Sequence, residues 1–166
     1  MKILVLSDSH SGLSFMRWCI RQIKPDAIVH LGDYFEDGQT IAQEFPHLVV
    51  HQVPGNCDAY RCLPYQPTVL SYPVCGVKLY MTHGHRHHVK QSIYALVRDA
   101  RQAGAQAALY GHTHIPDAHQ EGDLWVLNPG TCSSDGGSVG IIEAENGQII
   151  GCKVMTRIDL EEKVCF

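Results

Sequence analysis

The chain has 166 residues, of which 45% are hydrophobic and 18% are charged, and its formal net charge is −4. This length corresponds to about one domain, and the composition is that of a globular protein rather than of a disordered one. Lys and Arg are scattered along the sequence, so no basic stripe indicates a nucleic-acid polymer as a partner. We therefore expect a single domain over residues 1–166.

Histidine and cysteine are unusually frequent. The chain has 11 histidines against 13 Lys and Arg together, and its 7 cysteines are odd in number and include no CxxC pair. This cysteine pattern indicates neither a disulfide framework nor a thioredoxin-type site. The apolar run at the start is too short for a signal peptide, and no run approaches the length that spans a membrane. We expect a cytoplasmic protein with reduced cysteines and no membrane partner.

The predicted elements alternate between strands and helices, with an antiparallel end. Residues 2–7 (KILVLS) form a continuous apolar run, which is typical of a strand covered on both faces. The longest helix is expected over 89–105, where apolar residues recur at helical spacing. Asn146-Gly147 indicates a two-residue hairpin turn. The full set is strands 2–7, 27–32, 47–53, 77–82, 107–110, 124–128 and 138–155, and helices 15–23, 39–45 and 89–105.

Polar residues of a few types follow five of the predicted strands. They are Asp, Asn or His in every case, and in open α/β sheets the carboxyl ends of the strands form the crevice where ligands bind. We therefore expect these side chains to meet. They are Asp8 and His10 after the first strand, Asp33 after the second, Asn56 after the third, His83 and His85 after the fourth, and His112 and His114 after the fifth.

Each of these motifs also has a local explanation. Asp8 can cap a helix or a turn, and Gly32-Asp33 and Gly55-Asn56 are ordinary turn dipeptides. Such explanations give no reason for five strand ends to carry these residues at once, so their joint occurrence favours a metal site. The remaining histidines and one carboxylate lack this setting. We interpret His30, His47, His51 and His119 as structural or solvated, His87 and His88 as the start of the long helix, and Asp37-Gly38 as a turn.

The candidate ligands are carboxylate, amide and imidazole groups. Seven such groups are too many for one tetrahedral zinc ion. They suit two divalent ions that share a bridging carboxylate, and such pairs, about 3.5–4 Å apart, commonly serve phosphoester hydrolysis. The sequence contains neither a phosphate-cradling GxxxxGK[ST] loop nor a GxSxG nucleophile elbow.

The motifs DSH, GD, GN, HGH and GHTH, in this order, resemble the five motifs of calcineurin-like metallophosphoesterases. They span residues 8–114, and NPGT at 128–131 resembles a further family turn. The short length resembles the small YfcE-like phosphodiesterase branch. This resemblance implies an α/β fold, namely a four-layer α/β/β/α sandwich of two mixed β-sheets flanked by helices.

The resemblance also implies a role for each candidate ligand. Asp33 and Asn56 are the expected catalytic residues, with Asp33 bridging both ions. Manganese is the expected ion at both positions, with iron, nickel, cobalt and zinc as alternatives, because affinity order and cellular supply both decide occupancy. The implied ligands are Asp8, His10 and His114 for the first ion, Asn56, His83 and His112 for the second, and Asp33 for both.

Two further residues are expected to contact substrate. Many family members have histidine after the Asn of the GN motif, where it contacts the phosphate and helps to protonate the leaving group, whereas this chain has Cys57. YfcE-like members commonly show this change. A thiol is a weak donor, so we expect a preference for esters with good leaving groups. The alternatives are a small buried packing residue for Cys57 and a packed structural histidine for His85.

We therefore expect a binuclear metal-dependent phosphodiesterase that acts on a small-molecule phosphoester through a metal-bridging hydroxide. A phosphomonoesterase or nucleotidase acting at the same site is one alternative. A non-enzymatic scaffold similar to the retromer subunit of this fold is another, and it predicts eroded metal ligands, whereas all seven positions are filled here. The sequence carries no signature of the physiological substrate or of the oligomeric state.

Overall fold

The computed structural model describes residues 1–59, 66–134 and 136–162. Two five-stranded sheets form its framework. The strands are β1 (Lys2–Leu6), β2 (Ala27–His30), β3 (Val49–Gln52), β4 (Val69–Val74), β5 (Val77–Thr82), β6 (Ala107–Leu109), β7 (Asp117–Glu121), β8 (Leu124–Asn128), β9 (Ser138–Glu145) and β10 (Gln148–Thr156). The helices are α1 (Leu13–Ile23), α2 (Phe35–Glu44), α3 (Tyr94–Gln102), α4 (Arg157–Glu162) and the 3-10 turns η1 (Asn56–Asp58) and η2 (His85–His87).

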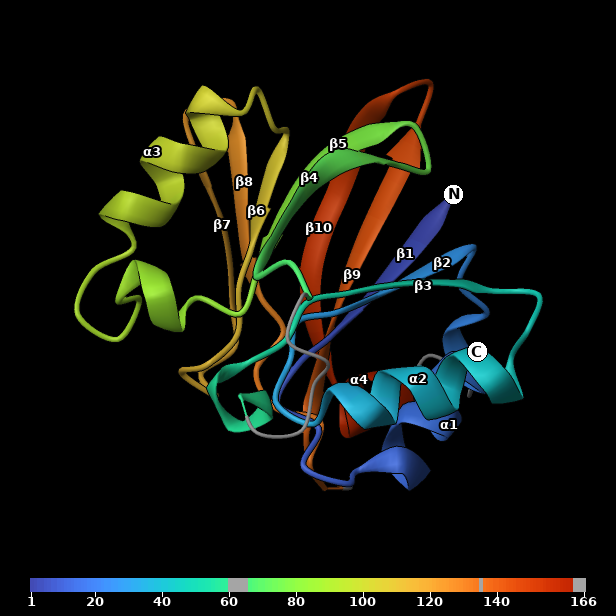
Figure 1. Ribbon diagram of the computed structural model, residues 1–166. Coiled ribbons are helices and arrows are strands. Elements are labelled where there is room, and N and C mark those ends of the chain that lie inside the picture. The colour runs from blue at the N-terminus through green and yellow to red at the C-terminus, as the bar shows by residue number, and fades with distance from the viewer. Residues whose placement is uncertain (60–65, 135, 163–166) are drawn as a thin grey trace.

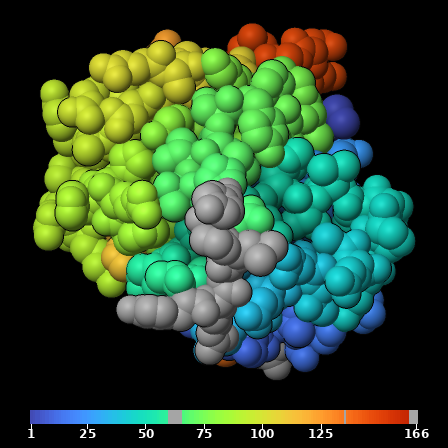
Figure 2. Space-filling view, viewed as in Figure 1, coloured from blue at the N-terminus to red at the C-terminus, as the bar shows by residue number. Residues whose placement is uncertain are grey.

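The strand orders are β10-β9-β1-β2-β3 in one sheet and β4-β5-β6-β8-β7 in the other. Both sheets contain parallel and antiparallel pairs. The helices α1, α2 and α4 pack against the first sheet, and α3 packs against the second (Figure 1). Figure 2 shows the regions of α1 and α2, in blue to cyan, and of α3, in yellow-green, on opposite flanks. The expected four-layer α/β/β/α sandwich is confirmed.

The strand β1 explains why the apolar run at the start of the sequence is continuous. Its side chains alternate, so that Ile3 and Val5 enter the core between the sheets, while Leu4 and Leu6 pack against the helices. All four are fully buried. Burying one such side chain stabilises the fold by about 1.5–3 kcal/mol, so a strand covered on both faces favours an apolar residue at every position.

The expected helix over 89–105 begins later and ends earlier. The segment 84–92 forms tight turns instead, with His88 in the left-handed region (φ 54°) and the Val89 N–H donating to the Gly84 carbonyl at 3.4 Å. A left-handed residue cannot continue a right-handed helix, so α3 starts only at Tyr94. Val89 is nevertheless buried, which is why it contributed to the helical pattern.

The second helix also differs from its prediction. It begins at Phe35, so Asp37 and Gly38 lie inside α2 and do not form a turn. The hairpin prediction is confirmed, because Asn146 and Gly147 have φ values of 50° and 76° between the paired strands β9 and β10.

Three elements were not predicted: the edge strands β4 and β7, and the helix α4. The strand β4 contains Pro73, which an edge strand tolerates because one side of its backbone needs no partner. The strand β7 reads DAHQE and has no apolar run. None of the helices in the described residues has the length and apolar character that a membrane crossing requires.

Candidate metal centre

The seven predicted ligands lie in loops at one end of the sandwich. The strands β1, β2 and β3 run parallel in the first sheet, and β5 and β6 run parallel in the second. Their carboxyl ends therefore point to the same end of the molecule, and each is followed by one of the polar motifs. The expectation that these side chains meet is tested by their distances.

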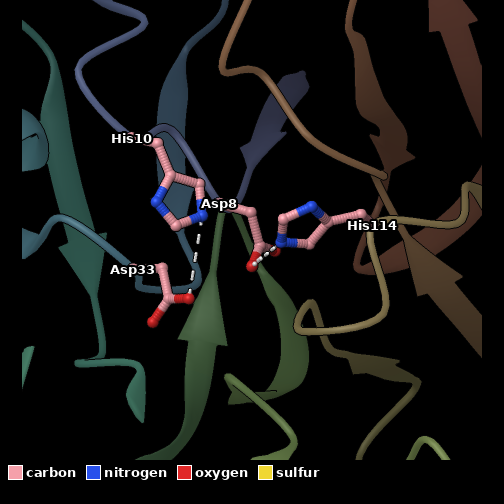
Figure 3. A group of neighbouring side chains, drawn as sticks. All are labelled: Asp8, His10, Asp33 and His114. Atoms are coloured by element: carbon pink, nitrogen blue, oxygen red, sulfur yellow. Dashed lines mark ion pairs between the residues drawn. The ribbon is translucent and has the colours of Figure 1, made fainter. Parts of the chain in front are cut away.

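Four of the ligands form a compact group (Figure 3). One ligand atom from each of Asp8, His10, Asp33 and His114 lies within 4.8 Å of the others. The Nε2 atom of His114 lies 3.0 Å from Asp8 Oδ1, and the Nε2 atom of His10 lies 3.8 Å from Asp33 Oδ2. Two carboxylates and two imidazoles at these distances could hold one divalent ion.

The other three ligands lie beside this group. The Nε2 atom of His83 is 3.1 Å from Asn56 Oδ1 and 3.5 Å from Asp33 Oδ1. The His83 and His112 rings are adjacent, with centroids 5.1 Å apart. Asp33 therefore directs Oδ2 toward His10 in the first group and Oδ1 toward His83 in the second.

Acceptor atoms in this centre lack donors. Asp8 Oδ1 is buried without a hydrogen-bond partner in the described residues, although His114 Nε2 lies nearby. The Nδ1 atom of His83 lies 2.7 Å from the Leu31 carbonyl oxygen, which can only accept, so this nitrogen carries the ring proton. In the neutral ring, the Nε2 atom then presents a lone pair to Asn56 Oδ1. Lone pairs that face one another are stabilised by a cation between them, so this set of atoms fits divalent metal ions.

A sequence profile of the calcineurin-like phosphoesterase superfamily domain matches residues 1–147. The chain belongs to this superfamily. Among curated proteins, the phosphoesterase is 29% identical to the probable metallophosphoesterase YsnB of Bacillus subtilis, over 79% of this chain and 75% of the relative. It is 27% identical to the phosphodiesterase YfcE of Escherichia coli K12, over 80% of each chain. The expected family assignment is confirmed.

Solved structures agree with this assignment. A predicted phosphoesterase from Streptococcus pneumoniae superposes with a TM-score of 0.73 at 28% identity, over 95% of this chain and 90% of that one. The zinc complex of Vps29 from Entamoeba histolytica superposes with a TM-score of 0.65 at 19% identity, over 95% of this chain and 99% of that one. The second likeness concerns the fold alone.

The backbone of the phosphoesterase is strained at its candidate ligands. Non-glycine residues are uncommon at positive φ, and such strain persists only where the surrounding structure over-determines it. Five of the seven candidate ligands have positive φ: Asp8, His10, Asp33, His112 and His114.

Asp58 holds two of the ligand loops together, and sequence reasoning did not identify it. Its fully buried carboxylate accepts the N–H groups of Tyr34 and Phe35 through Oδ1, at 2.8 and 2.9 Å, and that of Gly55 through Oδ2 at 2.7 Å. These donors follow Asp33 in one segment and precede the Asn56 turn in the other. Its place two residues after the GN motif was the signal available.

Asn128 performs the same task for the GHTH loop. Its Nδ2 donates to the Gly111 carbonyl at 3.1 Å and to Thr113 Oγ1 at 2.9 Å. Thr131 Oγ1 donates to the Asp8 carbonyl at 2.8 Å. A β-carbon at Gly111 would collide with the Ser7 hydroxyl, so only glycine allows this loop to approach β1 so closely.

Asp37 supports the loop that carries His10. It accepts the Ser9 hydroxyl at 2.7 Å and the Ser11 N–H at 2.9 Å. His30 lies beneath this loop, with Nε2 3.1 Å from Ser9 Oγ. Burial lowers the pKa of His30 to about 4, so this imidazole is neutral, in agreement with its interpretation as structural.

The two predicted substrate contacts lie at the centre. Cys57 is exposed, so the alternative of a buried packing residue is wrong. Partial desolvation of its sulfur and its hydrogen bond to Asp33 raise the pKa of Cys57 to about 11. The ring of His85 lies 5.4 Å from that of His83, and burial followed by the His83 charge lowers the pKa of His85 to about 4. A neutral His85 is compatible with either a substrate contact or a packing role.

The surroundings of Asp33 have opposing effects on its pKa. Burial alone raises its pKa, but the neighbouring His83 and the Cys57 N–H, which donates to Oδ1 at 2.9 Å, outweigh burial and hold the pKa of Asp33 below its usual value. The carboxylate is therefore ionised at neutral pH. An ionised carboxylate with one oxygen toward each histidine group has the charge and orientation that a shared ligand requires.

Proposed function

We propose that this phosphoesterase is a binuclear metal-dependent phosphodiesterase that hydrolyses small-molecule phosphodiesters. The observation that carries the proposal is the position of Asp33, whose two carboxylate oxygens face two separate histidine-containing groups. The proposed ligands of the first ion are Asp8, His10 and His114, those of the second are Asn56, His83 and His112, and Asp33 bridges both.

Two divalent ions bound here would lower the pKa of a bound water to supply hydroxide and would offset negative charge on the phosphoryl oxygens. We propose manganese as the preferred ion. The protein's own contribution is orientation. The Leu31 carbonyl holds the His83 proton on Nδ1, and the His112 N–H fixes Asp8 Oδ2 at 3.0 Å. The Cys57 N–H fixes Asp33 Oδ1 in the same way.

A phosphomonoesterase would use the same ligands, so an ester panel has to separate the two activities. The only support for the scaffold alternative is the likeness of the fold to Vps29. A non-enzymatic scaffold does not need buried carboxylate and imidazole atoms without hydrogen-bond partners, whereas the described residues include such atoms.

Metal analysis and reconstitution test the proposal. Purified protein should bind two manganese ions per chain, counted by titration calorimetry after chelation. Chelation should abolish hydrolysis of bis(p-nitrophenyl) phosphate, and manganese should restore it, with p-nitrophenyl phosphate as the monoester comparison. Full activity in rigorously metal-free protein, or a stoichiometry of one ion, would contradict the binuclear mechanism.

A further inference from the structure

A hollow of about 540 Å³ lies beside the GHTH loop, and we call it the Lys90 pocket. It is lined by Val89, Lys90, Tyr110, Thr113, Ile115, Pro116 and Asp117. Ligand pockets commonly measure about 300–1,000 Å³ and combine apolar walls with a few polar groups. The Lys90 pocket is an open hollow of this size with this mixture of side chains.

The pocket exists because of the turns that precede α3. The segment 84–92 brings Val89 against Gly84 and Tyr110, where a β-carbon at Gly84 would lie only 2.8 Å from a Val89 methyl group. The same turns leave Lys90 exposed on the pocket wall. If the helix had begun at residue 89, residues 89–92 would be helical and would not form these turns.

The pocket is lined by part of the loop that carries two candidate ligands. Thr113, on its wall, is the residue between the candidate ligands His112 and His114. The Asn128 side chain donates to Thr113 Oγ1 at 2.9 Å and thereby fixes this wall. If a phosphoester binds at the metal centre through its phosphoryl group, one of its ester substituents can therefore extend into the pocket.

Lys90 is the cation of the pocket lining. Among the residues that the structure describes, Lys90 has no ion pair or hydrogen bond, and Asp117, the acidic residue of the lining, has Oδ2 2.9 Å from His119 Nδ1. An unpaired cation beside apolar side chains favours an anionic partner.

We propose that the Lys90 pocket receives one ester substituent of the substrate and selects a substituent with an apolar, ring-sized body and a negatively charged tip. The body packs against Val89, Tyr110 and Ile115, and the tip pairs with Lys90. This inference rests on the proposed function, because it assumes that the centre next to Thr113 binds the phosphoryl group.

Three non-hydrolysable probes test the pocket: methylphosphonate, phenylphosphonate and 4-carboxyphenylphosphonate. Their dissociation constants are measured by calorimetry with manganese-loaded protein. We expect phenylphosphonate to bind about tenfold more tightly than methylphosphonate, because the ring buries apolar surface. The carboxylate should add about threefold, the usual size of an exposed ion pair, and 0.5 M salt should remove that gain.

Matched variants locate the effect. Lys90→Ala should remove the gain from the carboxylate and keep the gain from the ring, while Ile115→Ser should reduce the gain from the ring. Arg86→Ala is the control, because Arg86 is an exposed cation on the same segment that does not line the pocket. Equal affinity of the two aryl probes in the unaltered protein, no measurable binding of either, or an equal loss in Arg86→Ala would overturn the proposal.

The same samples separate this inference from the proposed function. Hydrolysis of bis(p-nitrophenyl) phosphate reports on the metal centre without a carboxylate. Normal hydrolysis without discrimination between the aryl probes would reject the pocket alone. Discrimination that depends on Lys90 without hydrolysis would support the pocket and reject the catalytic proposal.

Discussion

The two ends of the sandwich use the left-handed region of the backbone for different reasons. At the β9–β10 hairpin, Asn146 and Gly147 have φ values of 50° and 76°. A two-residue turn requires this conformation, and Asn and Gly are residue types that tolerate it. At the opposite end, Asp8, His112 and His114 have φ values of 52°, 67° and 60°, and no hairpin explains them. Their conformation is held by tertiary contacts.

This difference shows where the fold stores strain. The hairpin obtains its turn from local sequence, at little cost. The ligand loops obtain theirs from buried hydrogen bonds, such as those from the Ser7 hydroxyl and the His112 N–H to Asp8 Oδ2 at 2.6 and 3.0 Å. Strain that the surrounding structure has to maintain is characteristic of functional sites, and here it coincides with the convergence of the candidate ligands.

Substitution of the proposed bridge should have the largest effect. Asp33→Ala should lower kcat/KM for bis(p-nitrophenyl) phosphate by about 10³-fold or more, and metal content should fall with it, because both ions lose a shared ligand. Glu36→Ala is the control, since Glu36 is an exposed carboxylate three residues further along. Full metal content and activity in Asp33→Ala would show that the bridge is assigned to the wrong residue.

A substitution of Cys57 tests whether the residue at this position donates a proton to the leaving group. A thiol donates poorly, and a well-placed general acid is worth roughly 10²–10⁴ in rate, so Cys57→His should gain most on esters with poor leaving groups. The measurement is a plot of log kcat/KM against the pKa of the leaving group. Where chemistry limits the rate, the unaltered enzyme should give the steeper line. Parallel lines with both metals bound would exclude a proton-donor role at this position.

His30, beneath the His10 loop, should make stability depend on pH. Its pKa is about 4 in the folded protein and about 6.5 when unfolded, so the unfolded state binds this proton first as the pH falls. Stability should therefore decrease between about pH 6.5 and pH 4, by at most roughly 3 kcal/mol from this group. In His30→Gln this part of the slope should vanish, whereas the exposed His47→Gln should keep it.

Urea unfolding of metal-free protein at several pH values measures both slopes. An unchanged slope in His30→Gln would mean that His30 is protonated in the folded state, contrary to its buried position.

The smallest expected effects compare the two ends directly. Asn146→Ala should lower the unfolding free energy by about 1 kcal/mol, because alanine tolerates left-handed geometry poorly, and it should leave activity unchanged. In metal-free protein His114→Asn should raise stability by up to about 1 kcal/mol, since asparagine adopts this geometry more readily, while activity is lost. Thermal unfolding and the ester assay measure both variants. If both variants are less stable than the unaltered protein, the hairpin and the ligand loops do not differ in backbone strain.

The sequence predicted most of the fold, and each of its errors has an identifiable physical cause. Continuous apolar runs identified the central strands, whereas the polar edge strand β7 and the proline-containing β4 carry no such signal. The helical spacing near residue 89 was real, but the left-handed backbone at His88 is set by turns that spacing does not encode. Asp37 and Asp58 were missed as supports because their partners belong to other loops.

The sequence by itself determined where the central strands lie along the chain and which polar residues follow their carboxyl ends, since side-chain alternation and turn chemistry act between near neighbours. Only the tertiary structure decided that Asp33 turns one oxygen toward His10 and the other toward His83, and that Lys90 faces the hollow beside Thr113. These arrangements depend on contacts between distant parts of the chain, such as that between His112 and Asp8 across 104 positions. The packing of the two sheets specifies such contacts, and no local pattern does.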